Sequence, residues 1–564
     1  MKRLFALFLV LCLACMGTAA MAEYADGTYT GTGNGNNGPI SVTVTIENGQ
    51  IVSVEIGDNA ETPEISGPAF EAIPAAIVEA QSAEVDSVAG ATNSSRGVME
   101  AVTDALVQAG GEVPVTRLDA DVIVVGGGAA GMGAASNAAD AGATVLLFEK
   151  QSHLGGNTML SGGYVYATGT QDQKDAGVED SVEDLVAYWQ MRAEGHADEA
   201  LLTLVAENSN DTVEWLRANG VELVFAGPTG TSPVPRALIT GVGGTGLTTP
   251  VENALRAKEG VQICLNTPVT GLLTDESGKV VGVTAQGADG SLYEAYAKGG
   301  VVLATGGFDA SEEMKRAYAP SIADEICYSN AGNTGDGIRY AMEVGAATLF
   351  HDGVIGLRGI RNTSFADPLL SPIWMTTLLV DSQGNRFCDE SSDYPVLHTR
   401  LKENGSRYFY LIADAAQAAP MMEIIEALAA ENYAFCADTL EELAVVTWMD
   451  EETFTATVAR YNELTGQEDA DFGKAAELMT GIGEGPYYAI REVPTTIGSL
   501  GGICINTDTE VLKPDGTTVE GLFAAGACAN GQLFYREYPA SGTSIMMCFT
   551  LGRIAGTNAA ALAE

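Results

Sequence analysis

Basic residues are scarce in this sequence. Its 564 residues include 28 lysines and arginines against 74 aspartates and glutamates, which gives a formal net charge of −46 at pH 7. Binding to a phosphate backbone requires a basic face, so we expect no nucleic-acid partner. The acidic excess is typical of a solvated surface that keeps a protein soluble.

Residues that bind metals or haem are equally few. The sequence has four histidines, no C-x-x-C-H motif and no paired His or Cys spacing, so we expect neither covalent haem nor a metal site. Seven of its nine cysteines follow the first 22 residues, and this odd, scattered set does not predict a disulfide framework. Each histidine is expected to be structural: His153, His196, His351 and His398.

A long apolar run occurs only at the N-terminus. Two basic residues precede an apolar stretch from Leu4 to Cys15, and Ala20-Met21-Ala22 supplies an A-x-A cleavage site. This pattern predicts a secretory signal over residues 1–22 and an exported protein, at the cell surface or in the periplasm. The stretch is too short to cross a bilayer, which takes about 18 apolar residues or more. A lipid anchor at Cys15 is the less favoured alternative, because Cys12 stands where such sites usually have Leu.

The sequence is rich in hydrophobic residues, at 46%, and in glycine, with 67 residues, which favours an α/β fold with many tight turns. Its length allows two or three domains. We expect a small α+β domain over residues 23–112. There Tyr29 to Ile56 alternates apolar and polar side chains around Asn48-Gly49, which indicates a β-hairpin. Helices are expected near Ala69–Gln81 and Ser95–Ala109.

A second domain begins after a short linker. From Asp121 the chain shows a strand, a glycine-rich turn, an alanine-rich helix and a strand, which is the opening βαβ unit of a doubly wound sheet. We expect a Rossmann-like domain over residues 113–346 that is completed by residues 493–564. The stretch between them, 347–492, is less regular and richer in aromatic residues, so we predict an inserted α+β capping domain there.

The glycine-rich turn, VVGGGAAG, carries the first chemical signal. Gly126, Gly128 and Gly131 would allow a tight turn, close approach of the backbone to a pyrophosphate, and close packing of helix on strand. The N-terminus of the next helix favours a phosphate, and Glu149 at the end of the next strand can accept hydrogen bonds from ribose hydroxyls. An ordinary glycine-rich turn does not require a preceding strand, a following helix and an acidic residue at the end of the next strand. Their presence together predicts a dinucleotide site.

Four further blocks decide which dinucleotide is bound: Gly155–Gly163, Val301–Phe308, Gly332–Gly337 and Gly521–Gly526. With these blocks in order, the sequence from Asp121 to the C-terminus resembles the FAD-dependent fumarate reductase and succinate dehydrogenase flavoproteins.

The resemblance implies FAD, and it implies that the FAD is non-covalent, because Asn157 stands where members with covalent FAD have a histidine. The closing helix, from Ser541 to Ala561, is expected to direct its N-terminal dipole at the flavin and so stabilise the reduced anion. The FAD-binding residues implied are Gly126, Gly128, Ala129, Ala130, Gly131, Glu149, Lys150, Gly156, Asn157, Thr158, Gly162, Gly163, Ala304, Thr305, Gly306, Asp336, Gly526, Ser544 and Ile545.

A second motif, Asp86-Ser-Val-Ala-Gly-Ala-Thr92, resembles the flavin-transferase recognition sequence of FMN-binding domains, in which the last Thr is joined to the FMN phosphate. The resemblance implies covalent FMN at Thr92. Ala89 departs from the family pattern, which has Ser or Thr there. The alternative is a plain turn that caps a helix.

The two domains together resemble urocanate reductase and related exported respiratory reductases of anaerobic bacteria, which reduce an activated C=C bond. The resemblance implies that electrons enter at FMN, pass to FAD and leave as hydride. It also implies a membrane or extracytoplasmic electron donor, and a flavin transferase that attaches FMN during maturation.

The presumed substrate site departs from fumarate reductase. The general-acid Arg of that family comes four residues after a Glu, and four residues after Glu390 is Tyr394. The Glu and Arg that reload this acid are missing from Leu369–Trp374, and the substrate-binding His is replaced near Gly498. These losses remove a dicarboxylate clamp, so we do not expect fumarate as the substrate.

The residues that stand there instead, Tyr394 and the Y-P-x-x-G segment from Tyr538 to Gly542, resemble those of the 3-ketosteroid dehydrogenases of the same superfamily. That similarity implies that Tyr538 and Gly542 bind a substrate carbonyl and that Tyr394 is the acid or base. Hydride addition to the β-carbon places charge on the carbonyl oxygen, and the enolate must be held and then protonated. Arg536 is an alternative proton donor or a partner for a substrate carboxylate. Simpler explanations are a surface pair of Arg536 with Glu537 and a packing role for Tyr394.

We therefore predict a reductase of the C=C bond of an α,β-unsaturated carboxylate or ketone, with a small-molecule acceptor of the urocanate or enoate type. One alternative is a ketosteroid-type FAD dehydrogenase that works in the oxidative direction. Another is an electron-carrier flavoprotein that has no substrate of its own. The FMN motif disfavours the first alternative, and the capping insert disfavours the second.

Overall fold

The structure is a computed structural model that describes residues 24–83, 85–110, 115–361, 364–365, 373 and 375–563. The predicted signal sequence, Cys15 and most of Leu369–Trp374 lie outside the described residues. The chain divides into two compact units. The first comprises the residues up to Arg117 together with Gln286–Glu294, and the second comprises Leu118–Ala285 and Ala295–Glu564.

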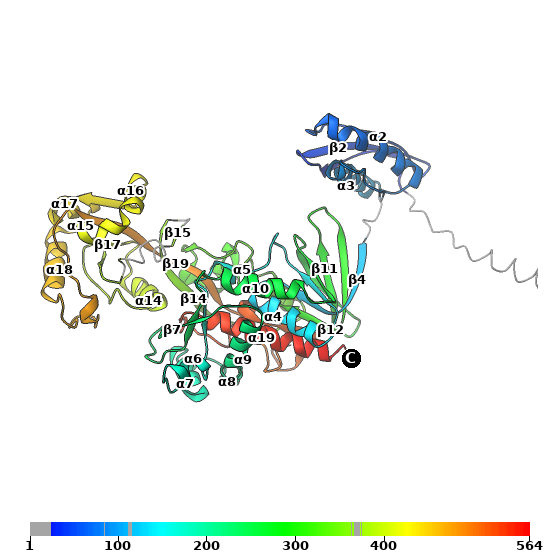
Figure 1. Ribbon diagram of the computed structural model, residues 1–564. Coiled ribbons are helices and arrows are strands. Elements are labelled where there is room, and N and C mark those ends of the chain that lie inside the picture. The colour runs from blue at the N-terminus through cyan, green and yellow to red at the C-terminus, as the bar shows by residue number, and fades with distance from the viewer. Residues whose placement is uncertain are drawn as a thin grey trace, which may run out of the picture. The chain divides into compact units, whose positions relative to one another are not determined.

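The first unit is a three-stranded antiparallel sheet covered on one face by two helices (Figure 1, blue). Alternate residues of the middle strand, Ile40 to Ile46, are buried and form the core with the helices. The predicted turn at Asn48-Gly49 is present, since both residues have positive φ and join two strands. Its elements are β1 (Gly27–Asn34), β2 (Pro39–Glu47), β3 (Gln50–Ile56), α2 (Pro63–Ala80) and α3 (Thr92–Gln108).

Helix α2 begins six residues before the predicted start at Ala69. Pro63 occupies its first turn, where a missing N–H costs no hydrogen bond, but Pro68 and Pro74 lie inside the helix. Two interior prolines disfavour a helix on sequence grounds. Packing of Ile73 and Ile77 against the sheet outweighs this preference.

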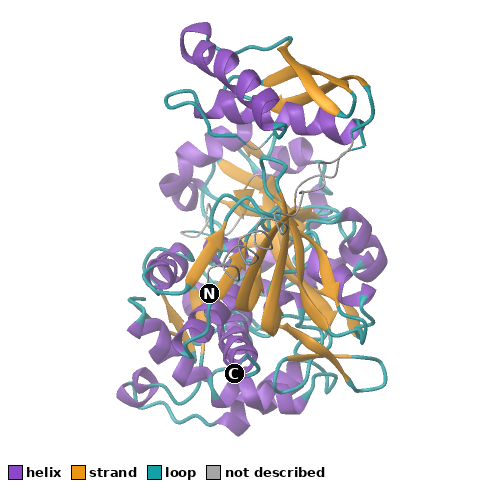
Figure 2. Ribbon diagram, turned by 90° about the vertical axis from the view of Figure 1, so that its right-hand side faces the viewer, coloured by secondary structure: helices purple, strands orange, loops and turns teal. Residues whose placement is uncertain are grey.

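The second unit is built on an eight-stranded sheet with the order β10-β11-β12-β4-β5-β9, and β21 also pairs with β12. Strands β4, β5 and β9 are parallel, as are β12 and β21, and the long strands have helices on either side (Figure 2). The predicted α/β class with a Rossmann-like sheet is confirmed. The strands are β4 (Val115–Val125), β5 (Val145–Phe148), β9 (Val261–Cys264), β10 (Val269–Thr274), β11 (Val280–Gln286), β12 (Leu292–Leu303), β20 (Glu510–Leu512) and β21 (Thr518–Ala524).

The first and the last helix of this unit pack along each other beside the sheet (Figure 1, cyan and red). They are α4 (Ala129–Asp140) and α19 (Thr543–Ala561). A layer of helices with the small sheet β6-β8-β7 adjoins them. Its elements are α5 (Gly156–Leu160), β6 (Tyr164–Tyr166), α6 (Gln171–Asp175), α7 (Val182–Arg192), α8 (Glu199–Glu207), α9 (Ser209–Ala218), β7 (Val224–Gly227), β8 (Ala237–Ile239) and α10 (Thr245–Arg256).

Two long antiparallel strands, β14 and β19, lead into the inserted region and back, with a register from Thr348–Ile503 to Gly359–Val493. The boundary expected after Glu492 lies inside β19, so this strand is shared by both parts. The elements are α11 (Glu312–Tyr318), β13 (Ile326–Cys327), α12 (Asp336–Glu343), β14 (Thr348–Arg361), β15 (Ser364–Phe365), β16 (Leu378–Asp381), α14 (Tyr394–Asn404), β17 (Phe409–Ala413), α15 (Ala415–Ala418), α16 (Met422–Ala430), β18 (Ala434–Ala437), α17 (Leu440–Thr447), α18 (Glu451–Glu463) and β19 (Tyr487–Ile503).

A buried ionic network fixes the segment that precedes Tyr394. Glu390 is fully buried and accepts two hydrogen bonds from Arg386, both of 2.9 Å, and one of 3.1 Å from Lys474. Arg386 also pairs with Asp469 at 2.8 Å. Each charge therefore has a partner, which is the condition under which buried ions are tolerated.

Replacement of Glu390 by Gln should destabilise the protein strongly, because the buried ammonium of Lys474 would lose its carboxylate partner. We expect a loss of about 3 kcal/mol in the free energy of unfolding, measured by urea denaturation. Glu463→Gln, which removes an exposed partner of Arg460 in α18, is the control and should change the midpoint little. Equal midpoints for the two variants would contradict a stabilising role for the network.

Candidate flavin and substrate site

A pocket of about 420 Å³ opens at the carboxyl ends of three neighbouring strands of the large sheet. Gly126 follows β4, Glu149 follows β5 and Thr305 follows β12, and all three residues line it. This edge of a parallel sheet is where α/β folds bind their ligands.

The glycine turn after β4 requires its glycines. Gly126 has a φ of +103°, and a Cβ there would lie 2.4 Å from the carbonyl oxygen of Ala304. A Cβ on Gly131 would lie 1.8 Å from the carbonyl oxygen of Gly126. Gly128, in contrast, has open space at its Cβ position and forms the N-cap of α4, which no side chain caps. Backbone N–H groups of an uncapped helix N-terminus facing open space suit a pyrophosphate.

Glu149 is buried beside this turn, and its two oxygens accept hydrogen bonds from the backbone N–H groups of Gly127 and Gln151, at 2.7 and 2.8 Å. Lys150 donates to Asp336 at 2.6 Å and to Thr334 at 2.7 Å. Burial acts to raise the pKa of Asp336, but the ammonium of Lys150 outweighs burial and the pKa is lowered. These hydrogen bonds fix the orientation of both acidic side chains.

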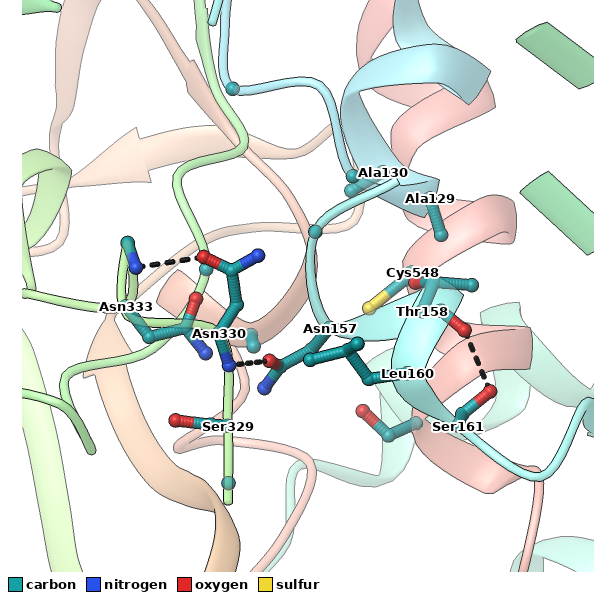
Figure 3. Close-up of a pocket in the computed structure, with 18 of the residues that line it drawn as sticks. Ala129, Ala130, Asn157, Thr158, Leu160, Ser161, Ser329, Asn330, Asn333 and Cys548 are labelled. Atoms are coloured by element: carbon teal, nitrogen blue, oxygen red, sulfur yellow. Dashed lines mark hydrogen bonds between the residues drawn. The ribbon is translucent and has the colours of Figure 1, made fainter. Parts of the chain in front are cut away.

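Asn157 bridges two walls of the pocket (Figure 3). Its amide nitrogen donates to the carbonyl oxygen of Ile497 at 3.1 Å, and its amide oxygen accepts from the backbone N–H of Asn330. Next to it, the hydroxyl of Ser161 donates to the carbonyl oxygen of Thr158 at 2.7 Å. An amide has no nucleophilic nitrogen for a bond to flavin, so this position suits a non-covalent cofactor.

The N-terminus of α19 also borders the pocket. Its N-cap, Gly542, has a φ of +92°, and a Cβ there would lie 2.8 Å from backbone atoms of Val165. Ser544 and Ile545 of its first turn line the pocket, and no side chain caps the helix. The positive end of a 19-residue helix thus faces the pocket, where it would favour a reduced, anionic flavin.

Aromatic and apolar side chains also line the pocket. The rings of Tyr394 and Tyr538 are stacked with centroids 6.4 Å apart. The buried Tyr538 hydroxyl accepts a hydrogen bond of 2.8 Å from the N–H of Ser544, and burial raises its pKa. Its own proton therefore stays on the phenol and is free to be donated. Other apolar or aromatic lining residues include Tyr164, Tyr328, Ile355, Leu357 and Ile497.

The structure brings together three of the four predicted catalytic residues: Tyr394, Tyr538 and Gly542 all line this pocket. Arg536 does not line it. Its side chain is exposed and lies over the ring of Tyr535, with 5.2 Å between the guanidinium carbon and the ring centroid. The suggested pair with Glu537 is not formed either, because Glu537 pairs with Arg192.

Most of the predicted cofactor residues also line the pocket. They are Gly126, Gly128, Ala129, Ala130, Glu149, Lys150, Gly156, Asn157, Thr158, Gly162, Ala304, Thr305, Gly306, Asp336, Ser544 and Ile545. Gly131, Gly163 and Gly526 do not line it, and each lies at a close contact where a Cβ would meet a neighbouring atom within 3 Å.

Two residues of the site carried no signal in the sequence. Tyr164 lines the pocket directly after the Gly162-Gly163 pair, and burial raises the pKa of its hydroxyl. Asp393 joins α14 to two loops around the pocket. Neither residue lies in a recognisable motif.

In the first unit, Thr92 is the first residue of α3 and its side chain is exposed. The preceding Gly90 has a φ of +85° and open space at its Cβ position, and no side chain caps the helix. The hydroxyl of Ser95 accepts a hydrogen bond of 3.0 Å from the N–H of Val88, which holds this turn against the helix. An exposed hydroxyl at an uncapped helix N-terminus is accessible for joining to a phosphate.

The fold and the two sites define a class, the flavoproteins that combine an FMN-binding module with a Rossmann-like FAD-binding domain. Family models agree: the FAD binding domain matches residues 121–545, and the FMN-binding domain matches residues 35–107. The chain belongs to this FAD-binding family. FAD and FMN are therefore its cofactors, as predicted, and it is a flavin-dependent oxidoreductase.

Curated relatives extend over both domains. Urocanate reductase of Eggerthella lenta is 30% identical, and the match covers 97% of this chain and 94% of that protein. NADH:acrylate oxidoreductase of Vibrio harveyi is 29% identical over 96% of this chain, but this chain spans only 62% of its length. The predicted resemblance to urocanate reductase is confirmed.

Solved structures match the second unit. The open conformation of a flavocytochrome c3 fumarate reductase has a TM-score of 0.66 and 30% identity, over 79% of either chain. A 3-ketosteroid-Δ4-(5α)-dehydrogenase from Rhodococcus jostii, in complex with 4-androstene-3,17-dione, has a TM-score of 0.65 and 29% identity, over 78% of this chain and 97% of that one.

Replacement of Gly126 by Ala should abolish FAD binding, because the new Cβ would collide with the backbone of Ala304. After purification the protein is denatured, and the amount of FAD released per protein is measured by absorbance. Gly142→Ala is the control, since Gly142 also has a positive φ, of +87°, but open space at its Cβ position. If Gly126→Ala retained FAD as Gly142→Ala does, the glycine turn would not be the FAD site.

Replacement of Thr92 by Ala should remove the flavin that stays bound after denaturation. Protein produced together with a flavin transferase is denatured in acid, separated on a gel and examined for flavin fluorescence. Thr103→Ala, in the middle of the same helix, should keep the fluorescence. Retention of fluorescence by Thr92→Ala would place the attachment elsewhere.

Proposed function

We propose that the protein is an exported reductase that adds hydride to a C=C bond conjugated to a carbonyl group, as in α,β-unsaturated carboxylates and ketones. The observation that carries this proposal is the placement of Tyr394, Tyr538 and Gly542 at one pocket with the predicted FAD-binding residues. FAD bound there supplies the hydride, and FMN in the first unit supplies the electrons that reload it.

The role of Tyr538 is to hold the carbonyl oxygen of the acceptor. Its phenol is buried, accepts one hydrogen bond from Ser544 and keeps its proton for donation. Gly542, at the N-terminus of α19, adds the positive end of the helix dipole. As hydride arrives at the β-carbon, charge grows on the carbonyl oxygen, and donors that are already oriented stabilise it without reorganisation.

The role of Tyr394 is to protonate the α-carbon. Its ring is stacked on that of Tyr538, and both residues line the same pocket. A tyrosine hydroxyl positioned beside the substrate can act as a general acid. Arg536 stays an alternative donor only if its exposed side chain turns toward the pocket.

The charges around the pocket favour an uncharged carbonyl compound. Among the lining residues that the structure describes, Lys150 alone is cationic, and it is already paired with Asp336. Glu149, Asp309 and Asp336 contribute acidic groups. A carboxylate removed from water without a cationic partner is strongly disfavoured. We therefore place ketones ahead of carboxylates as acceptors.

We further propose that the protein works outside the cytoplasm, where a membrane or extracytoplasmic donor reduces the FMN and a flavin transferase attaches it. The apolar N-terminal stretch with its A-x-A site supports export. No helix within the described parts of the chain is long and apolar enough to cross a membrane.

Two alternatives fit less of the structure. A ketosteroid-type dehydrogenase would use the same tyrosines in the oxidative direction, but it would not need an FMN module to deliver electrons. An electron carrier would not need a pocket with two stacked tyrosines beside a cofactor site.

The proposal is tested by anaerobic reoxidation of the dithionite-reduced holoprotein with urocanate, acrylate, 2-cyclohexen-1-one and testosterone. At least one of these acceptors should restore the oxidised flavin spectrum and yield the saturated product. If none reoxidises the flavin, the reductase function is wrong.

Tyr394→Phe should slow this reoxidation by about 10²- to 10⁴-fold, because the general acid is lost, while reduction by dithionite is unchanged. Tyr340→Phe is the control. Tyr340 lines the same pocket, but its hydroxyl is engaged with the carbonyl oxygen of Val269 at 2.8 Å. Wild-type rates in Tyr394→Phe would remove Tyr394 from the mechanism.

A further inference from the structure

Asp393 lies where three segments around the pocket meet. One carboxylate oxygen accepts a hydrogen bond of 2.7 Å from the backbone N–H of Gly230. The other oxygen accepts from the N–H of Tyr394 at 3.0 Å and from the hydroxyl of Ser541 at 3.4 Å. A single side chain of the inserted region thus contacts the loop after β7 and the loop before α19.

Those two loops are themselves joined tightly. The hydroxyl of Tyr188 donates to the carbonyl oxygen of Pro539 at 2.6 Å and accepts from the N–H of Thr231 at 3.1 Å. A Cβ on Gly230 would lie only 2.3 Å from the carbonyl oxygen of Pro539. Gly230 is therefore pressed against the loop that carries Tyr538, and any group that binds Gly230 is fixed relative to that loop.

An N-cap function alone does not explain Asp393. As N-cap of α14 it needs only one oxygen, the one that accepts from Tyr394. The second oxygen points away from the helix to Gly230. Removing a carboxylate from water is unfavourable unless its oxygens accept hydrogen bonds. Asp393 is half-buried, and its second oxygen accepts a hydrogen bond from a different part of the fold.

We propose that Asp393 is a positioning residue that ties the helix of Tyr394 to the loop of Tyr538 and Gly542. This inference rests on the proposed function for its kinetic consequence, but not for the bridge itself. Without the bridge, α14 would still be capped and folded. Tyr394 would lose its fixed placement relative to Tyr538, with which it stacks at 6.4 Å.

The variant that tests the bridge is Asp393→Ser. Serine preserves N-capping of α14 but is too short to reach Gly230, so helix formation and bridging are separated. Asp393→Asn keeps only one acceptor oxygen, which can bind either Gly230 or Tyr394 and Ser541. Its exchange and reoxidation rates should therefore lie between those of Asp393→Ser and wild type. Asp389→Asn is the control. Asp389 precedes Asp393 by four residues, and its side chain accepts hydrogen bonds from the nearby Ser391.

The first measurement needs no substrate. In hydrogen–deuterium exchange of the holoprotein, with fragmentation that resolves single amides, the Gly230 amide should exchange faster in Asp393→Ser. It should be unchanged in Asp389→Asn. Unchanged protection of Gly230 in Asp393→Ser would show that the bridge does not exist, whatever the function of the protein.

The second measurement separates positioning from general damage. Reoxidation of the reduced Asp393→Ser variant by 2-cyclohexen-1-one should be slower by about 10- to 100-fold at saturation, because a small misplacement of a catalytic group costs rate. FAD content and reduction by dithionite should match wild type. Equal reoxidation rates, or loss of FAD and slowed reduction together with slowed reoxidation, would overturn the positioning role. If wild type is not reoxidised by this enone, the measurement is made with whichever of the four acceptors does reoxidise it. If none does, the proposed function fails, while the exchange result still decides the bridge.

Discussion

The close approach of three backbone segments at Gly126 is the constraint on which the rest of the second unit depends. Gly126 touches the backbone after β12 at Ala304, and Gly131 touches Gly126 from the first turn of α4. Only glycine fits both positions. Because of this contact, the carboxyl ends of the strands and the uncapped N-terminus of α4 face one pocket, and Glu149 is held there by backbone donors. The walls that carry the tyrosines are assembled around this fixed edge.

The substrate end of the pocket is made from parts that are distant in sequence. Tyr394 is the first residue of α14 in the inserted region, whereas Tyr538 and Gly542 precede α19, the last helix. Strand β19 begins in the inserted region and continues to the pocket, which its residues Ile497 and Gly498 line. The described residues that line the pocket include Tyr394, Tyr538 and the N-terminus of α19, and Lys150 is the one cationic side chain among them.

The sequence predicted the parts of the protein that depend on local geometry. The strand, turn and helix around Gly126 and the Asn48-Gly49 hairpin each follow from residue types within a short window. Helix α3 was expected near Ser95 and begins three residues earlier, at Thr92. The start of α2 was missed, because tertiary packing holds a helix through two prolines. Resemblance located Tyr394, Tyr538 and Gly542, which the structure brings together. For Arg536 the sequence left a catalytic and a surface position open, and the side chain is exposed. The sequence did not show that Tyr164 lines the pocket or that Asp393 contacts the loops around it, because these placements depend on contacts between distant loops.

The central claim is that this pocket activates an uncharged carbonyl group through tyrosines. A matched pair of acceptors tests it most directly: 4-phenyl-3-buten-2-one and cinnamate share a skeleton and differ in having a methyl ketone or a carboxylate. We expect the ketone to reoxidise the reduced holoprotein at least about tenfold faster than the acid, because the acid would have no cationic partner among the described lining residues. Faster reoxidation by cinnamate would contradict the account.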